Sequence, residues 1–271
     1  TTLSFNDYFL EITFKQLKLI LSDNSLNNLK IKALSCAIEA LNTKSIIPGD
    51  YFPQLVPIVL DEVEKGKSSQ SFMLLQRLIL IMGQRTVQFV PEIMNIIHKV
   101  WDTSLMTEIL SVVAALVNQV GPDFSPYATK LITDLLDVLS SSIIPHPEYA
   151  LKCIPLLASI CPSFPHLSQL MIPHFCNIIM LKETGNEIKV CTLKSLRFLV
   201  QNTKPGENTT SVIRIAINYC VSPNKDLSEA AFQVLYSIMI RLGSNFNNYT
   251  HRTVEKLTQN KIIPKEFADI N

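Results

Sequence analysis

Four side chains between positions 161 and 176 are of the types that hold zinc, namely Cys161, His166, His174 and Cys176. Cysteine thiolates and histidine nitrogens bind zinc when three or four of them converge on one point. The apolar periodicity predicts that His174 and Cys176 share one helix, where a separation of two positions turns them about 200° apart. They therefore face opposite sides of that helix, and we interpret the four as helix-packing residues. The sequence predicts no metal site.

The sequence also lacks the residues that nucleotide binding and nucleophilic catalysis need. Phosphate binding calls for a glycine-rich loop, and a kinase site adds a catalytic aspartate and metal-binding carboxylates. The chain has only 7 glycines, all isolated, and it contains no HRD-like or DFG-like triplet. Neither a GxSxG signature nor a Cys–His signature accompanies its serines and 5 histidines. We therefore predict no catalytic residue and no cofactor site in this segment.

The composition is that of a packed and nearly neutral chain. Hydrophobic residues make up 47% of the 271 residues and charged residues 17%, so a large apolar core can form. The formal net charge of +1 argues against a nucleic-acid partner, because such proteins usually carry a basic domain or stripe. The cysteines lie in apolar surroundings without a CxxC pair, which indicates reduced, buried thiols in a cytoplasmic or nuclear protein. They are Cys36, Cys153, Cys161, Cys176, Cys191 and Cys220.

One stretch, from Cys153 to Leu181, carries no charged residue and is long enough to suggest a membrane span. Four prolines interrupt it, and a proline inside a helix removes a hydrogen bond and breaks or kinks the helix. They are Pro155, Pro162, Pro165 and Pro173. We therefore predict two packed helices here and no direct membrane insertion.

The elements that position these residues follow a repeat of about 40 residues. An aromatic or aliphatic residue, often with a nearby proline, opens an amphipathic run at five places: Phe9, Phe52, Val90, Tyr127 and Leu167. Their spacings are 43, 38, 37 and 40 residues, which is typical of HEAT and armadillo units. No strand-period alternation and no Asn-Gly hairpin signal occurs, so the pattern predicts helices throughout.

The predicted fold is all-α, an α-solenoid of about six HEAT-type helix pairs plus an incomplete seventh, in a single array over residues 1–271. The predicted pairs are 8–41, 51–82, 87–120, 124–160, 164–201 and 210–242, with a partial pair at 246–259. The helices expected within them are 8–22 and 26–41, 51–64 and 69–82, 87–101 and 104–120, 124–139 and 147–160, 164–181 and 186–201, and 210–220 and 227–242. One pair cannot bury its apolar faces alone, so neighbouring pairs must cover them. Because the chain begins at Thr1 and stops inside the seventh pair, we expect an interior piece of a longer array.

Prolines occur at two kinds of position in this scheme. Pro53, Pro91 and Pro126 fall in the first turn of a predicted helix, where the missing N–H costs little and the fixed φ favours the helix. Pro57, Pro155 and Pro173 fall inside predicted helices, and we expect them to bend these helices without ending them.

One helix, predicted at 186–201, carries a polar stripe that a partner could use. Glu187, Lys194, Arg197 and Gln201 are separated by 7, 3 and 4 positions and therefore share one side of the helix. The second helix of each pair lines the partner-binding face in solenoids of this kind. The alternative, which the sequence favours, is an ordinary solvated polar stripe.

Three segments resemble the HEAT array of target-of-rapamycin kinases. Residues Phe5 to Leu26 resemble the opening of a repeat block in that family, and Tyr51 to Pro57 resemble its recurrent aromatic-Leu-Pro-Gln-aliphatic-aliphatic-Pro helix start. Residues Gly121 to Tyr127, which lead into Lys130, resemble a further repeat of the same block. The resemblance covers residues 5–139 well and the remainder only as repeats, and the connection 42–50 departs from it.

The resemblance implies a non-catalytic scaffold segment of a large Ser/Thr protein kinase in growth signalling. In that family the array supports dimer assembly and docks adaptor subunits such as Raptor, so that substrates reach a distant kinase domain. The expected location is the cytoplasm. For the full-length protein, a membrane-peripheral or a nuclear location is an alternative. The alternative is an independent scaffold or transport adaptor, similar to a phosphatase scaffold or a karyopherin, that binds protein partners.

Overall fold

A computed structural model describes residues 12, 14–17, 19–20, 27–42, 51–101, 103–161, 165–203, 206 and 208–246 of the 271-residue chain. The chain divides into two compact units, Thr1–Tyr127 and Ala128–Asn271. Every regular element of the described residues is an α-helix or a 3₁₀ helix, which confirms the all-α prediction. None of these helices is long and apolar enough to cross a membrane.

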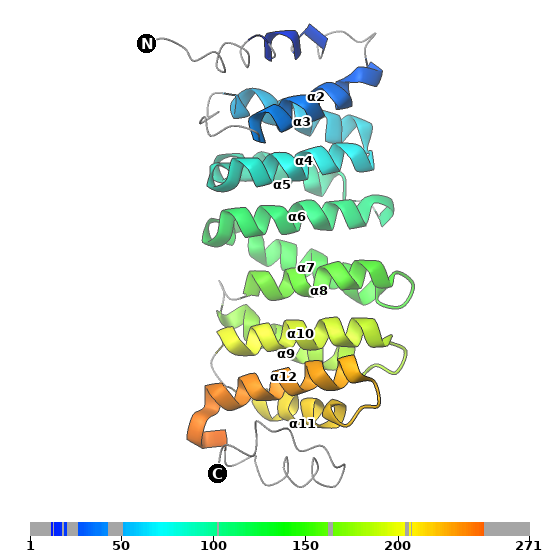
Figure 1. The fold of residues 1–271 in the computed structure, drawn as a ribbon, viewed down its shortest axis with the longest axis vertical. Coiled ribbons are helices and arrows are strands. Elements are labelled where there is room, and N and C mark those ends of the chain that lie inside the picture. The colour runs from blue at the N-terminus through cyan, green and yellow to red at the C-terminus, as the bar shows by residue number, and fades with distance from the viewer. Residues whose placement is uncertain are drawn as a thin grey trace. The chain divides into compact units, whose positions relative to one another are not determined.

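The first unit consists of two layers of helices. One layer contains α2 (Asn27–Asn42), α4 (Ser69–Met82) and α6 (Met106–Val120), and α4 packs between the other two (Figure 1). The other layer contains α3 (Phe52–Gly66) and α5 (Val90–Lys99), which pack against each other, and α3 also packs against α4. Each apolar face is thus covered by the neighbouring pair, as in an α-solenoid.

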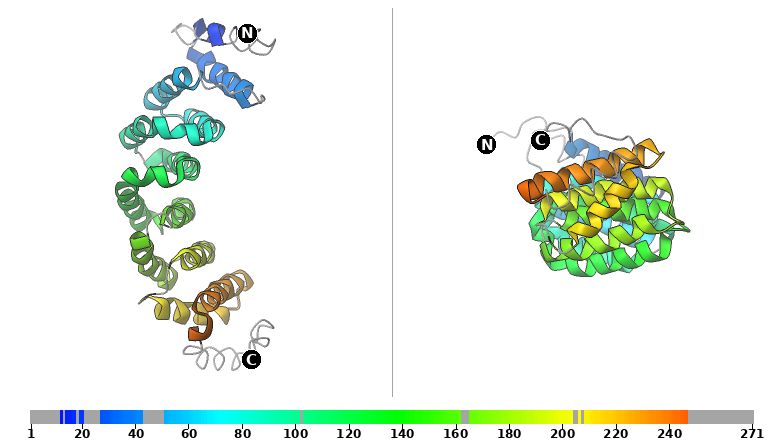
Figure 2. Two further views of the ribbon diagram at one scale, coloured as in Figure 1. Left: turned by 90° about the vertical axis from the view of Figure 1, so that its left-hand side faces the viewer. Right: turned by 90° about the horizontal axis from the view of Figure 1, so that it is seen from below.

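The second unit repeats this arrangement. Its first layer contains α8 (Pro147–Ile160), α10 (Asn186–Asn202) and α12 (Lys225–Leu242), with α10 packed between α8 and α12 (Figure 1). Its other layer includes α9 (Pro165–Met180) and α11 (Thr209–Cys220), which contact each other. The remaining helix, α7 (Ser125–Ser142), begins just before the boundary between the units. Figure 2 shows the paired helices of each unit from two further directions.

Polar contacts inside each unit join residues that are about one repeat apart. In the first unit Arg77 Nη1 lies 2.8 Å from Glu39 Oε1, a sequence separation of 38 residues. In the second unit Arg241 Nη2 donates to the carbonyl of Thr203 at 2.7 Å, again 38 residues away. These separations match the predicted period, because equivalent positions of consecutive pairs are stacked next to each other.

The helix boundaries agree closely with the predicted ones. The ranges of α4 and α8 coincide with the predictions, and the bounds of α3, α7, α9 and α11 differ from them by three residues or fewer. The helix predicted at 87–101 is shorter, because a 3₁₀ helix over Gly83–Phe89 precedes α5. The helix predicted at 8–22 and the partial seventh pair lie largely outside the described residues. The single array over 1–271 stays a prediction, since the two units are described separately.

Local chemistry explains where several helices begin. Pro53, Pro91 and Pro126 lie in the first turns of α3, α5 and α7, as predicted. The side chain of Asn224 caps α12, because its Oδ1 accepts a hydrogen bond from the Leu227 amide at 3.1 Å. This cap starts α12 at Lys225, two residues earlier than the apolar pattern predicted.

Three of these helices end at a glycine with an unusual backbone conformation. Gly83, Gly121 and Gly243 follow α4, α6 and α12 with φ of 56°, 60° and 52° and ψ near −132°. A 3₁₀ helix starts at each glycine and brings a buried phenylalanine back onto the core. Only glycine tolerates this conformation without strain, so the residue type determines where each of these three helices ends.

The charge-free stretch from Cys153 to Leu181 forms parts of two helices. It is divided between α8 and α9, as predicted. Both helices continue through their internal prolines, Pro155 and Pro173, and α3 continues through Pro57. The bend expected at each proline stays a prediction.

Candidate functional site

The polar stripe that the sequence singled out lies on α10, in the middle of the second unit. The apolar residues Ile188, Leu196 and Leu199 are buried and hold α10 against its neighbours, α8, α9 and α12. This packing leaves the opposite side of the helix free for polar residues. The stripe is therefore carried by a helix that its apolar side holds in place.

The four predicted residues occupy different surroundings. Glu187 and Lys194 are exposed, whereas Arg197 is partly buried. Gln201 turns toward α12, where its Nε2 donates a hydrogen bond of 3.2 Å to Ser237 Oγ. Gln201 thus takes part in the contact between α10 and α12, whereas Glu187 lies in the first turn of α10.

Lys194 and Arg197 line a groove of about 480 Å³ between α10 and α12. The lining residues are Val190, Lys194 and Arg197 from α10 and Asp226, Glu229, Ala230 and Gln233 from α12. Cations thus form one wall of the groove and carboxylates form the other, while Val190 and Ala230 are apolar. This charge-lined space will be called the α10–α12 groove.

The acidic wall was missed when the sequence was read one helix at a time. The Gln201–Ser237 bond joins positions 36 residues apart and so defines how α10 and α12 align. The same offset applied to Val190 reaches Asp226, which lines the groove opposite it. Applied to the stripe itself, the offset of 36 reaches Pro223, Ala230, Gln233 and Ser237, so residue spacing alone does not find the acidic wall.

Arg197 has a buried polar atom without a partner. Its Nε is enclosed by protein and makes no hydrogen bond in the described residues. A buried donor left unsatisfied costs about 1–3 kcal/mol, so most such groups in proteins find an acceptor. Because Arg197 lines the α10–α12 groove, an acceptor that enters the groove and displaces the groups around Nε would satisfy this donor.

A partly buried thiol lies between the two ends of the stripe. Burial raises the pKa of Cys191, while the positive charge of Lys194 lowers it and the negative charge of Glu187 raises it. Its Sγ lies 3.8 Å from the carbonyl oxygen of Leu151 in α8, so the thiol faces α8 and not α12. The thiol is therefore a packing group on the other flank of α10.

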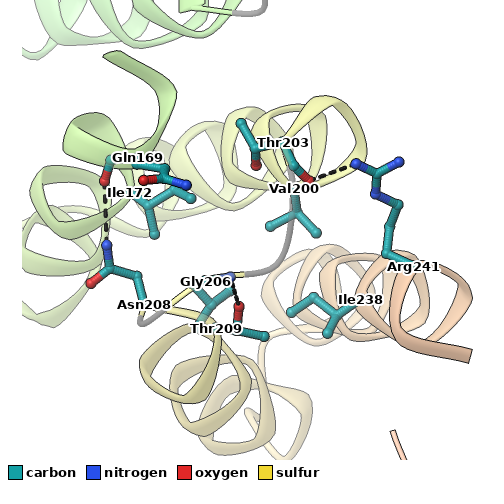
Figure 3. A pocket seen from close by; sticks show the side chains of 10 residues that line it. Gln169, Ile172, Val200, Thr203, Gly206, Asn208, Thr209, Ile238 and Arg241 are labelled. Atoms are coloured by element: carbon teal, nitrogen blue, oxygen red, sulfur yellow. Dashed lines mark hydrogen bonds between the residues drawn. The ribbon is translucent and has the colours of Figure 1, made fainter. Parts of the chain in front are cut away.

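A second hollow, of about 380 Å³, lies where α9, α10, α11 and α12 meet (Figure 3). Its apolar side includes Ile172, Val200 and Ile238, and its polar residues bind one another. The Asn208 Nδ2 donates to the Gln169 carbonyl at 3.3 Å. The Gly206 amide donates to Thr209 Oγ1 at 2.9 Å, and Arg241 donates to the carbonyl of Thr203 at 2.7 Å. The Asn208 bond links the start of α11 to α9, and the Arg241 bond links α12 to the end of α10, so these polar groups hold neighbouring helices together.

The residues considered for zinc are not arranged as a metal centre where they are described. No group of three or more His, Cys, Asp or Glu side chains in the described part of the chain could hold a metal ion. His174 is exposed whereas Cys176 is buried, in agreement with their predicted opposite orientations. Burial raises the pKa of Cys161 to about 12 and that of Cys176 to about 11, so both thiols stay protonated. The side chain of His166 lies outside the described residues.

The prediction that all six cysteines are buried is wrong for Cys36. Cys36 is exposed on α2, while Leu34, Ala37 and Ile38 of the same helix are buried. It lies beside the buried stripe of α2, on the side that the neighbouring helices leave uncovered. Four cysteines are fully buried and will be called the buried thiols: Cys153, Cys161, Cys176 and Cys220.

Stacked helix pairs with a charge-lined groove between the second helices of two pairs define a helical-repeat protein of the α-solenoid class. No family model matches the chain. The chain is 19% identical over 261 residues to the serine/threonine-protein kinase TOR2 of Saccharomyces cerevisiae. The aligned region makes up 95% of this chain and 10% of that protein. The chain is also 17% identical over 273 residues to the serine/threonine-protein kinase mTor of Drosophila melanogaster. This aligned region makes up 98% of this chain and 11% of that protein.

These two matches confirm the resemblance to target-of-rapamycin kinases as a distant relationship. The similarity extends over nearly the whole chain, beyond residues 5–139 where the motifs were clearest. The chain spans about a tenth of the length of the curated relatives it matches.

Proposed function

We propose that the chain is a non-catalytic scaffold segment of a large, cytoplasmic TOR-like Ser/Thr protein kinase. In this role it supports assembly and dimerisation of the kinase. It also docks adaptor subunits of the Raptor type, which bring substrates to a kinase domain elsewhere in the protein.

The observation that carries this proposal is the extent of the similarity to the two TOR kinases. It covers 95% and 98% of this chain but only 10% and 11% of those proteins, so it corresponds to one stretch of each. A stretch made of stacked helix pairs suits a scaffold, because each pair is held by its neighbours and presents its surface at a defined position.

The arrangement of the second unit supports a docking role. Three helices, α8, α10 and α12, lie side by side, and the α10–α12 groove opens between two of them. Because the apolar faces of α10 and α12 are buried, partner binding there does not require the core to rearrange.

A binding assay with purified components tests the proposal. The 271-residue chain is immobilised and a Raptor-type adaptor subunit is passed over it, while sedimentation measures self-association. We expect a dissociation constant of about 1 µM or tighter for the adaptor, equivalent to about −8 kcal/mol. A phosphatase catalytic subunit and a karyopherin cargo peptide serve as comparison partners.

Each result bears on the proposal. Retention of the adaptor, with neither comparison partner retained, supports it. Retention of a comparison partner in place of the adaptor would favour an independent scaffold or transport adaptor. Transfer of phosphate from ATP to a generic peptide by the chain alone would show that the segment is catalytic and would overturn the proposal.

A further inference from the structure

The α10–α12 groove contains four charged residues that do not neutralise one another through direct contacts. In the described residues the side chains of Lys194, Arg197, Asp226 and Glu229 form no hydrogen bond and no ion pair. Charged residues on neighbouring helices elsewhere do pair, as Arg77 and Glu39 do at 2.8 Å. The groove therefore presents two separated rows of opposite charge.

Arg197 provides a second, independent indication of a ligand. Its buried Nε lacks an acceptor in the described residues, although most buried donors have one. A carboxylate is the acceptor that suits a guanidinium best, since the planar fork of N–H groups matches its two oxygens. The wall formed by α10 thus selects for an acidic side chain.

The opposite wall selects for a basic side chain. Asp226 and Glu229 lie on consecutive turns of α12, and both are exposed at the groove. Their carboxylates attract a lysine or arginine and repel an acidic group. A ligand of a single sign would therefore be attracted by one wall and repelled by the other.

We propose that the α10–α12 groove binds a helical segment of a protein partner that carries an acidic and a basic residue seven positions apart. Packed helix axes are about 8–10 Å apart, and seven helical residues span about 10.5 Å. A partner helix that crosses α10 and α12 thus places its carboxylate at Arg197 and Lys194 and its cation at Asp226 and Glu229. A spacing of four positions fits less well, because such a pair is about 6 Å apart and attracts itself.

This inference rests on the proposed function, because it names the chemistry of the partner that the scaffold docks. It also assigns unequal roles to the four charges. The Arg197 contact is partly desolvated and bidentate, so its loss should weaken binding about tenfold. Each of the three exposed charges forms an ion pair with the ligand that solvent screens, so the loss of one should weaken binding about two- to fivefold.

The test uses designed peptides and the full 271-residue chain. The probe is a capped, alanine-rich peptide of about 16 residues, long enough to be partly helical, with one glutamate and one arginine seven positions apart. Matched peptides replace the glutamate by glutamine, replace the arginine by glutamine, or reduce the spacing to four positions. The affinities of the chain and its variants are measured by fluorescence anisotropy of the dye-labelled peptide. In the natural chain the ¹H–¹⁵N signal of Arg197 Nε, which is assigned by its disappearance in Arg197→Lys, locates the binding site.

We expect the mixed-charge peptide to shift the Arg197 Nε signal with a dissociation constant of about 1 mM or tighter. The two glutamine peptides and the peptide with the shorter spacing should bind about five- to tenfold more weakly. Equal binding by the mixed-charge and glutamine peptides would overturn the inference, as would an Arg197 Nε signal that does not move.

Variants of the chain complete the test. Lys194→Glu combined with Arg197→Glu should abolish binding, whereas Lys130→Glu, a single charge reversal at an exposed position of α7, should leave it unchanged. Retained binding in the double variant would refute the proposed site. If the double variant does not fold, Arg197→Lys preserves the charge and should still bind about tenfold more weakly, since the bidentate fork is lost.

The same variants separate this inference from the proposed function. If the double variant binds the adaptor subunit as tightly as the natural chain does, the scaffold role stands and the groove is refuted as its docking site. If the natural chain binds the mixed-charge peptide but no adaptor subunit, the groove stands and the proposed partner is refuted.

Discussion

Replacing Gly121 by alanine should destabilise the first unit through backbone strain alone. Gly121 ends α6 with φ 60° and ψ −131°, a conformation that residues with a side chain rarely adopt. A Cβ at this position would meet no atom within 4 Å, so steric crowding contributes nothing. The strain costs about 1–3 kcal/mol, while the reduced freedom of the unfolded chain returns about 0.4–1 kcal/mol. The free energy of unfolding should therefore fall by about 0.5–2 kcal/mol.

Gly66→Ala is the matched control for this substitution. Gly66 is the last residue of α3, and a Cβ there also meets no atom within 4 Å. Its φ does not lie in the positive range, so alanine brings no strain and only restricts the unfolded chain. We expect Gly66→Ala to raise the free energy of unfolding by about 0.4–1 kcal/mol. The two substitutions add the same atoms in the same unit and should shift stability in opposite directions.

Urea unfolding followed by tryptophan fluorescence measures both effects. Trp101 is the sole tryptophan of the chain and lies in the first unit, so its signal reports on the unit that contains both glycines. With a slope of about 2 kcal/mol per M, Gly121→Ala should lower the urea midpoint by about 0.25–1 M. An unchanged or higher midpoint for Gly121→Ala would refute the argument that the conformation at this turn requires glycine.

Four further predictions concern other parts of the chain. Lys67 ends α3 with φ 40°, so Lys67→Gly should raise the free energy of unfolding by about 0.5–1 kcal/mol; a lower urea midpoint would contradict this. Tyr219→Phe removes a 2.7 Å hydrogen bond to the carbonyl of Ile179 and should cost about 0.5–1.5 kcal/mol, measured by thermal unfolding followed by circular dichroism; no loss would show that the bond is dispensable. Burial raises the pKa of the buried thiols to about 12, or about 11 in one case, from 9.0. Only the unfolded chain loses these protons just above pH 9.0, so the thiols' contribution to stability should be constant below that pH and fall as pH rises toward 12; stability that increases between pH 9.0 and 12 would exclude the assignment. In the native protein at about pH 8, maleimide should label exposed Cys36 before the buried thiols, and mass spectrometry of the labelled peptides checks the order.

The helices themselves could be predicted from the sequence because their signals are local. The period of about 40 residues, the apolar stripes and the first-turn prolines identified the pairs, and the bounds of α4 and α8 were predicted without error. Periodicity was less informative where another interaction determined the boundary. Because Asn224 caps it, α12 begins two residues before the predicted start. The 3₁₀ helix over Gly83–Phe89 makes α5 shorter than the helix predicted at 87–101.

The candidate site could be predicted only in part. Lys194 and Arg197 were singled out because they share one side of a single helix, which residue spacing alone reveals, and both line the groove. Asp226 and Glu229 were not found, because they come from another helix that only packing brings to the groove. The exposed Cys36 was misassigned for a related reason, since an apolar neighbourhood in sequence does not show which side of a helix its neighbours cover.

The sequence by itself determined that this protein is a stack of helix pairs distantly related to a stretch of TOR kinases. Helix formation, capping and repeat length depend on residues within one or two helices, so one sequence contains enough information for them. The tertiary structure decided which charges meet. The packing of α10 against α12 brings Lys194 and Arg197 to the same groove as Asp226 and Glu229, although the offset of 36 places Ala230 and Gln233 directly opposite them. It also decided that Arg197 Nε is buried without an acceptor, because burial of an atom depends on every element packed around it.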